Sequence, residues 1–272
     1  MSKLLYPPKS KELTEGVTLL QEISEKNAPL TYIRLKIIEM ESGASYEESL
    51  TQFECCLVAL TGNITVTDFA ETFSEIGTRE SVFERIPTDS VYLSTQQKFR
   101  VTAKTAAKIV LCYAPSEKKL PTQLIKASDN SIENRGMYQN KRLVHTILSD
   151  TSSISDALLV VEVLTDSGNW SSYPPHKHDQ NDLPRESLLE ETYYHEMNPR
   201  QGFVFQRVYT DDRSLDETMT VENGDVVVVP KGYHPVGVPD GYESYYLNIM
   251  AGPIKKWQFH NDPAHEWILN RK

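Results

Sequence analysis

Short apolar runs separated by turn residues make up most of the chain. The runs are rich in Val, Ile, Thr and Tyr, a composition typical of β-strands. Many short strands at nearly regular spacing predict a β-sandwich or β-barrel fold. The runs lie at 31–39, 55–60, 64–66, 90–93, 99–102 and 107–112, and then at 157–164, 191–195, 202–209, 225–229 and 244–250.

Helical periodicity is weak along the whole chain. Ser10–Lys26 is expected to hold a turn or two of helix, and Ser214–Glu217 a brief turn. Turn residues at 61–63 separate two apolar runs, which predicts a hairpin. The polar segment Pro115–Tyr138 predicts a connection between two β-rich halves.

The charge balance excludes several classes of partner. The 272 residues include 28 Lys and Arg against 38 Asp and Glu, a formal net charge of −10. Because so acidic a surface repels phosphate, we expect no nucleic-acid and no membrane partner. No apolar run approaches the roughly 20 residues of a spanning helix, and Met1–Ser10 lacks the apolar core of a signal peptide. A cytoplasmic location is therefore expected.

The three cysteines, Cys55, Cys56 and Cys112, predict no disulfide framework, since their number is odd and two are adjacent. We expect them in the core. The histidines are concentrated in the second half of the chain, since six of the seven lie between His176 and His265. The first half of the chain is therefore interpreted as scaffold.

Two histidines alternate in the segment that follows a pair of prolines. On an extended strand His176 and His178 share a face, and Lys177 points the other way. Two imidazoles on one face can bind one metal ion, although ordinary surface or core histidines give the same pattern. A third histidine, His234, follows a strand that Pro230 ends and Gly232 bends; it could also be purely structural.

A carboxylate lies on another predicted strand. Glu191, Tyr193 and His195 share one face by the period of two, and Glu190 and Tyr194 share the other. The simpler alternative is an edge strand with two solvated glutamates. Taken together, three imidazoles and one carboxylate suit a divalent cation such as zinc, manganese, iron or nickel.

The two histidine motifs resemble the paired motifs of cupins, and the chain as a whole is similar to the 5-deoxy-glucuronate isomerase family of inositol catabolism. The similarity extends over roughly residues 5–268. Its most specific segments are 171–179 (SSYPPHKHD), 189–195 (LEETYYH), 205–217 (FQRVYTDDRSLDE), 229–236 (VPKGYHPV) and 245–253 (YYLNIMAGP).

This resemblance implies a mainly β bicupin of two jelly-roll barrels. The N-terminal barrel, 1–130, has no H-x-H and is expected to be degenerate and metal-free, whereas the barrel at 131–272 carries the site. The implied metal ligands are His176, His178, Glu191 and His234, with Zn²⁺ preferred and Mn²⁺ or Fe²⁺ as alternatives. Twelve residues separate His178 from Glu191, more than in most cupins, so Glu190 and Glu186 remain alternative ligands.

The implied reaction is the aldose–ketose isomerisation of 5-deoxy-D-glucuronate to 2-deoxy-5-keto-D-gluconate. A Lewis acid would assist proton transfer through an enediolate. His195 and Tyr193 are the candidates for the base. Arg207 and Tyr209 are expected to bind this sugar acid, with a structural ion pair as the alternative for Arg207.

Two other functions use similar chemistry, namely a mononuclear iron dioxygenase and a non-enzymatic sugar-binding bicupin. A homo-oligomer is expected if exposed sheet edges need covering. The sequence assigns no role to His260 and His265.

Overall fold

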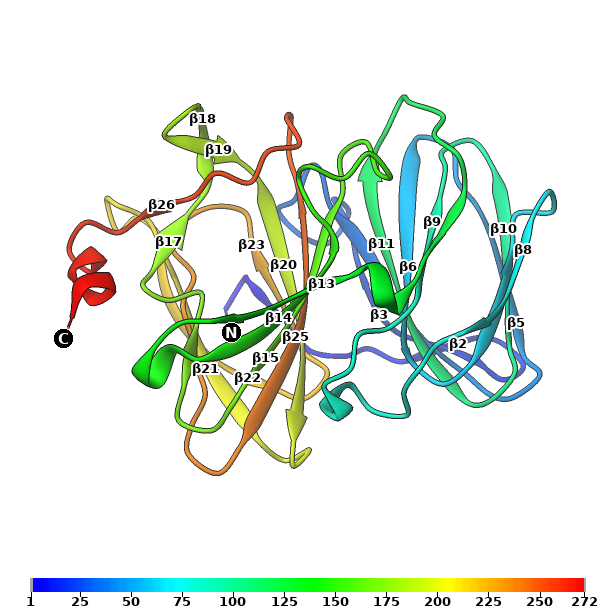
Figure 1. The fold of residues 1–272 in the computed structure, drawn as a ribbon, viewed down its shortest axis with the longest axis horizontal. Coiled ribbons are helices and arrows are strands. Elements are labelled where there is room, and N and C mark those ends of the chain that lie inside the picture. The colour runs from blue at the N-terminus through cyan, green and yellow to red at the C-terminus, as the bar shows by residue number, and fades with distance from the viewer. Residues whose placement is uncertain (1, 272) are drawn as a thin grey trace. The chain divides into compact units, whose positions relative to one another are not determined.

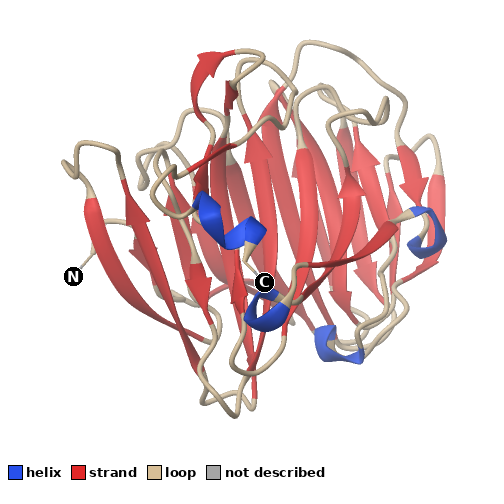
Figure 2. Ribbon diagram, turned by 60° about the vertical axis from the view of Figure 1, so that its left-hand side comes forward, coloured by secondary structure: helices blue, strands red, loops and turns tan. Residues whose placement is uncertain are grey.

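The computed structural model describes residues 2–271 and is built almost entirely of β-strands (Figures 1 and 2). Within that range the helical elements are short 3₁₀ turns. No helix there combines the length and the apolar character that crossing a bilayer would require. The prediction of a mainly β fold is confirmed. The 3₁₀ turns are η1 (Val82–Glu84), η2 (Ala127–Asp129), η3 (Tyr138–Asn140) and η4 (Glu266–Asn270).

The chain divides into two compact units. The N-terminal unit comprises Pro8–Ser131 and Thr146–Val160. The C-terminal unit comprises the segment ending at Pro7, Ile132–His145 and the residues from Val161 onward. The simpler division into 1–130 and 131–272 stays a prediction.

The N-terminal unit has a seven-stranded sheet in the order β12-β9-β6-β11-β4-β3-β2 and a four-stranded sheet in the order β5-β10-β7-β8. Neighbouring strands are antiparallel throughout both sheets. The strands are β2 (Lys11–Thr14), β3 (Val17–Ile23), β4 (Arg34–Met40), β5 (Ser45–Ser49), β6 (Phe53–Thr61), β7 (Ile64–Thr67), β8 (Thr72–Ile76), β9 (Ser90–Leu93), β10 (Lys98–Ala103), β11 (Ala107–Pro115) and β12 (Gln123–Ile125).

Most residues of a seven-stranded sheet in the order β1-β23-β20-β25-β15-β14-β13, and all of a four-stranded sheet in the order β16-β24-β21-β22, belong to the C-terminal unit. Two small pairs, β17 with β26 and β18 with β19, complete it. The strands are β1 (Leu5–Tyr6), β13 (Ser131–Arg135), β14 (Arg142–Leu148), β15 (Leu159–Thr165), β16 (Trp170–Ser171), β17 (His176–Lys177), β18 (Asp179–Asp182), β19 (Glu186–Leu188), β20 (Glu190–Asn198), β21 (Phe203–Tyr209), β22 (Asp216–Glu222), β23 (Val226–Val229), β24 (Val236–Gly237), β25 (Glu243–Ala251) and β26 (His260–Asn261).

Alternating side chains build the core of the N-terminal unit. On β6, Cys55, Leu57 and Ala59 join one buried cluster, as alternation along a strand requires. Cys56 and Cys112 are also fully buried, and all three thiols are free. The expectation that the cysteines pack in the core is confirmed.

Three expectations about local structure were wrong. Ser10–Lys26 forms β2 and β3 rather than helix, because Val17, Leu19 and Ile23 are buried with a period of two. Asp216 begins strand β22 where a brief turn was expected. The segment Pro115–Tyr138 is not only a connection, since it also holds β12 and β13.

The turn at residues 61–63 does not make a hairpin. It leads from β6, which pairs with β9 and β11, to β7, which pairs with β8 and β10 in the other sheet. Gly62 has φ +78°, and a Cβ there would lie 2.2 Å from the carbonyl oxygen of Ala106. The glycine therefore lets the chain change sheets against neighbouring backbone.

A buried carboxylate ties residues 156–158 to the strands of the N-terminal unit. Glu54 accepts hydrogen bonds from the backbone amides of Asp156, Ala157 and Leu158 at 2.7–2.8 Å, and from the Tyr92 hydroxyl at 2.7 Å. Four donors satisfy a charge that would otherwise be costly to bury.

Glu54→Ala is predicted to lower the free energy of unfolding by roughly 3 kcal/mol, because buried donors lose their acceptor. Urea denaturation measures the change. Glu39→Ala, at an exposed glutamate of β4, is the control and should change stability little. Equal stability of the two variants would contradict the role given to Glu54.

Candidate metal centre

Three histidines of the C-terminal unit converge on one point. His176 lies in β17, His178 follows directly, and His234 lies in the turn after β23. The ring centroid of His234 is 5.0 Å from that of His176 and 5.2 Å from that of His178. One ring nitrogen from each histidine lies within 4.8 Å of the other two. The cluster could therefore hold a metal ion.

Backbone carbonyls orient two of these rings. Nδ1 of His178 is 3.0 Å from the carbonyl oxygen of Leu189, and Nδ1 of His234 is 2.8 Å from that of Gly232. A carbonyl only accepts, so Nδ1 of each ring carries a proton, and Nε2 is the ring nitrogen that lies beside Glu191. Nε2 is therefore the atom of each ring that would bind a cation, after releasing any proton it carries.

Glu191 completes the cluster. Its Oε2 atom lies 3.0 Å from Nε2 of His178 and 3.0 Å from Nε2 of His234. The amide of Asn248 donates to the other carboxylate oxygen. Of the alternatives, Glu186 is engaged by Lys177, and Glu190 precedes Glu191 on β20 and so faces the other side.

The donor set fits a divalent cation. Nε2 of His234 is buried and makes no hydrogen bond, although Oε2 of Glu191 is only 3.0 Å away. Burial works against ionisation of Glu191, but the neighbouring imidazoles of His234 and His178 hold its pKa well below the usual value. An ionised carboxylate and imidazole nitrogens are the ligands that zinc and related ions prefer.

The residues between His178 and Glu191 explain the unusual spacing. They form a hairpin of β18 and β19, in which Asp179 pairs with Leu188. The amide of Leu189 then donates to the carbonyl oxygen of His178 at 2.8 Å. The hairpin returns the chain to His178 so that β20 begins beside it.

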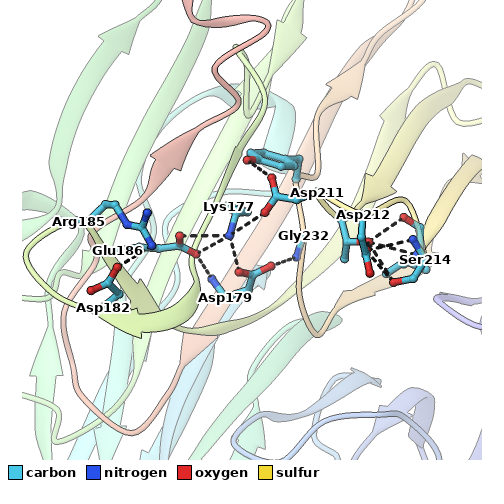
Figure 3. A network of polar contacts seen from close by, with 12 residues as sticks. Lys177, Asp179, Asp182, Arg185, Glu186, Asp211, Asp212, Ser214 and Gly232 are labelled. Carbon is cyan, nitrogen blue, oxygen red and sulfur yellow. Dashed lines mark hydrogen bonds and ion pairs between the residues drawn. The ribbon is translucent and has the colours of Figure 1, made fainter.

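A polar network has Lys177, the residue between the two alternating histidines, at its centre (Figure 3). Nζ of Lys177 contacts Asp179 at 2.7 Å, both oxygens of Glu186 at 3.2 Å and Asp211 at 3.4 Å. Lys177 is buried, and the three carboxylates balance its charge.

The same network joins the two segments that bear histidines. Oδ2 of Asp179 accepts a hydrogen bond from the amide of Gly232 at 2.9 Å (Figure 3). Gly232 in turn orients His234 through its carbonyl. With φ +94°, a Cβ at Gly232 would lie 2.5 Å from the carbonyl oxygen of Tyr209, so this bend requires glycine.

The candidate bases lie on the inner face of β20. The ring of Tyr193 is 5.8 Å from that of His234 and 6.0 Å from that of His195. The Tyr193 hydroxyl is 3.1 Å from Oγ of Ser172. His195 is fully buried, and its Nε2 is 3.2 Å from the side-chain oxygen of Gln206.

Arg207 and Tyr209 are not brought to the cluster. Arg207 lies next to Gln206 on β21 and points to the opposite face, where it forms a bidentate ion pair with Asp216 at 2.7 Å. The Tyr209 hydroxyl donates to Asp262 at 2.8 Å. Their role in substrate binding stays a prediction, and this geometry does not favour it.

Two functional residues were not predicted from the sequence. Asn248 forms a hydrogen bond with Glu191, and Ser172 forms one with Tyr193. Asn248 had a usable signal, because an amide in the middle of an apolar strand needs a buried partner. Ser172 had none, since its position depends on a backbone φ of +50°.

Lys177→Gln is predicted to lower the free energy of unfolding by about 3 kcal/mol, because it leaves buried carboxylates without a cation. Chemical denaturation measures the loss. Lys231→Gln, at an exposed lysine in the turn before His234, is the matched control and should have little effect. An unchanged Lys177→Gln variant would show that the network does not stabilise the site.

The chain matches the KduI/IolB family over residues 4–268. Relatives named 5-deoxy-glucuronate isomerase are 67% identical in Bacillus licheniformis and 65% identical in Bacillus subtilis, each over 271 residues and 100% of both chains. A third relative of that name, from Listeria innocua, is 64% identical over 272 residues and 100% of both chains.

Solved structures agree with this match. An IolB-like protein from Salmonella typhimurium LT2 superposes with a TM-score of 0.94 at 47% identity, covering 98% of this chain and 99% of that one. Oxalate decarboxylase from Lactobacillus farciminis, in a formate complex, superposes with a TM-score of 0.68 at 14% identity, covering 100% and 91%. The second likeness confirms the bicupin fold. The chain belongs to the KduI/IolB family.

Proposed function

We propose that this protein is a 5-deoxy-glucuronate isomerase of inositol catabolism, which converts an aldose acid into the corresponding ketose acid. The observation that carries the proposal is the identity of 63–67% over the full chain with relatives of that name. The converging histidines supply the chemistry that such a reaction needs. The dioxygenase and sugar-binding alternatives have no comparable support.

His176, His178, His234 and Glu191 are the proposed ligands of one divalent cation, with zinc preferred for a set of three imidazoles and one carboxylate. When bound, the cation supplies positive charge that stabilises negative charge on the substrate oxygens. The carbonyl oxygens beside His178 and His234 engage Nδ1 of each ring and leave Nε2 as the binding atom.

Tyr193 and His195 are the proposed proton-transfer groups. Burial, reinforced by the charge of Glu191, raises the pKa of Tyr193, so its phenol stays protonated and donates. Burial lowers the pKa of His195 to about 4, so its imidazole is neutral at pH 7 and able to accept a proton. The tyrosine is therefore the better hydrogen-bond donor and the histidine the better base.

We also propose that the enzyme acts in the cytoplasm and that it forms a homo-oligomer. The edge strand β2 of the N-terminal unit is largely exposed, and exposed edges favour association.

His234→Ala is predicted to empty the metal site and to lower turnover of 5-deoxy-glucuronate by more than about a hundredfold, with the fold retained. Elemental analysis and an activity assay measure the two effects. His265→Ala, at a partly exposed histidine 4.0 Å from Asp262, is the matched control and should keep both metal and activity. Full metal occupancy in His234→Ala would refute the ligand assignment.

His195→Ala is predicted to slow the exchange of solvent deuterium into the substrate by roughly a hundredfold or more, as expected for loss of a general base. Tyr193→Phe should lower turnover as well. Metal content should be unchanged in both variants. If deuterium exchange stays at the wild-type rate in both, neither residue transfers the proton.

A further inference from the structure

A cavity of about 460 Å³ lies in the C-terminal unit and includes His176 in its wall. Tyr173, Trp257 and Phe259 give it aromatic sides. Three arginines, Arg135, Arg142 and Arg271, also line it. The lining therefore combines cationic side chains with a histidine of the metal cluster.

Among residues 2–271, neither Arg142 nor Arg271 has an acidic partner, but Arg271 donates to the carbonyl oxygen of Met137, far along the chain from the histidines. Nη1 of Arg142 donates to the carbonyl oxygens of Asn140 at 2.9 Å and Tyr173 at 3.4 Å. Arg135, by contrast, donates to Glu133 at 2.8 Å. Arg142 is half-buried at the start of β14, so its charge is partly desolvated and unbalanced.

The remaining donors of Arg142 are available to a ligand. Its hydrogen bonds to protein use Nη1 alone, which leaves Nε and Nη2. Two parallel N–H groups of a guanidinium match the two oxygens of a carboxylate. The guanidinium of Arg142 contacts the carbonyl oxygen of Tyr173, which precedes His176 by three residues. Arg142 and His176 also line the same cavity.

We propose that Arg142 binds the carboxylate of the sugar-acid substrate in this cavity, with the opposite, reacting end of the sugar directed towards the cluster of His176, His178 and His234. The inference rests on the proposed function for the identity of the substrate. It replaces Arg207 as the carboxylate-binding residue, because Asp216 already occupies the donors of Arg207.

The test compares Arg142→Gln and Arg142→Lys with Arg207→Gln, which represents the competing assignment, and with Arg200→Gln, at an exposed arginine, as the matched control. Calorimetry of the metal-loaded proteins measures binding of D-glucuronate and of the neutral sugar D-glucose. Steady-state assays with 5-deoxy-glucuronate measure KM and kcat separately. Metal content and circular dichroism establish that each variant is loaded and folded.

Arg142→Gln is expected to weaken glucuronate binding and to raise KM by roughly 10- to 100-fold, the effect of losing a charge-assisted hydrogen-bond pair. Metal content and glucose binding should not change. Arg142→Lys should bind glucuronate with intermediate affinity, because it keeps the charge but loses the planar fork. Arg200→Gln should behave as the wild type, and Arg207→Gln should lose less glucuronate binding than Arg142→Gln.

The proposal is overturned if the wild type shows no preference for glucuronate over glucose, or if Arg142→Gln loses both ligands equally. It is also overturned if Arg207→Gln shows the larger loss of glucuronate binding. Failure of the proposed isomerase activity would give a different result from failure of the Arg142 proposal. In the first case the wild type would not turn over 5-deoxy-glucuronate, while selective loss of glucuronate binding in Arg142→Gln would still establish the anion site.

Discussion

The hydrogen bond from the Gly232 amide to Asp179 joins the two segments of chain that carry the histidines. Lys177 donates a hydrogen bond to Asp179. Its side chain lies on the strand face opposite to the two alternating histidines. One short segment thus presents ligands on one side and is anchored on the other. Because the carbonyl of Gly232 also orients His234, a single turn fixes the position and the orientation of the third imidazole.

The two units use their polar side chains differently. In the N-terminal unit, Glu48 accepts hydrogen bonds from Lys36 at 3.0 Å, Tyr113 at 2.9 Å and Tyr46 at 2.5 Å, so its partners all come from the protein. In the C-terminal unit, three histidines converge, and the buried Nε2 atom of His234 makes no hydrogen bond. Among the described residues it is this group that could hold a metal ion, which places the chemistry in the C-terminal unit.

Alternation along strands made most of the fold and the metal cluster predictable, since it relates neighbours in sequence to one face in space. It failed at β2 and β3, where the apolar Leu20 takes an outward position and the polar Gln21 a buried one. The carboxylate-binding residue was not predictable by the same means. Arg207 stands out as a charge in mid-strand, yet the hairpin of β21 and β22 brings Asp216 to it. Arg142 belongs to no motif, and only tertiary contacts reveal its unbalanced charge.

The proposed chemistry depends on three imidazoles and Glu191 binding one cation. This can be measured by anomalous diffraction from crystals of the zinc-loaded protein, recorded on both sides of the zinc absorption edge. We expect one peak in the C-terminal unit, about 2.0–2.2 Å from a ring nitrogen of His176, His178 and His234 and from an oxygen of Glu191. A fully active crystal with no peak there, or with its zinc bound elsewhere, would contradict it.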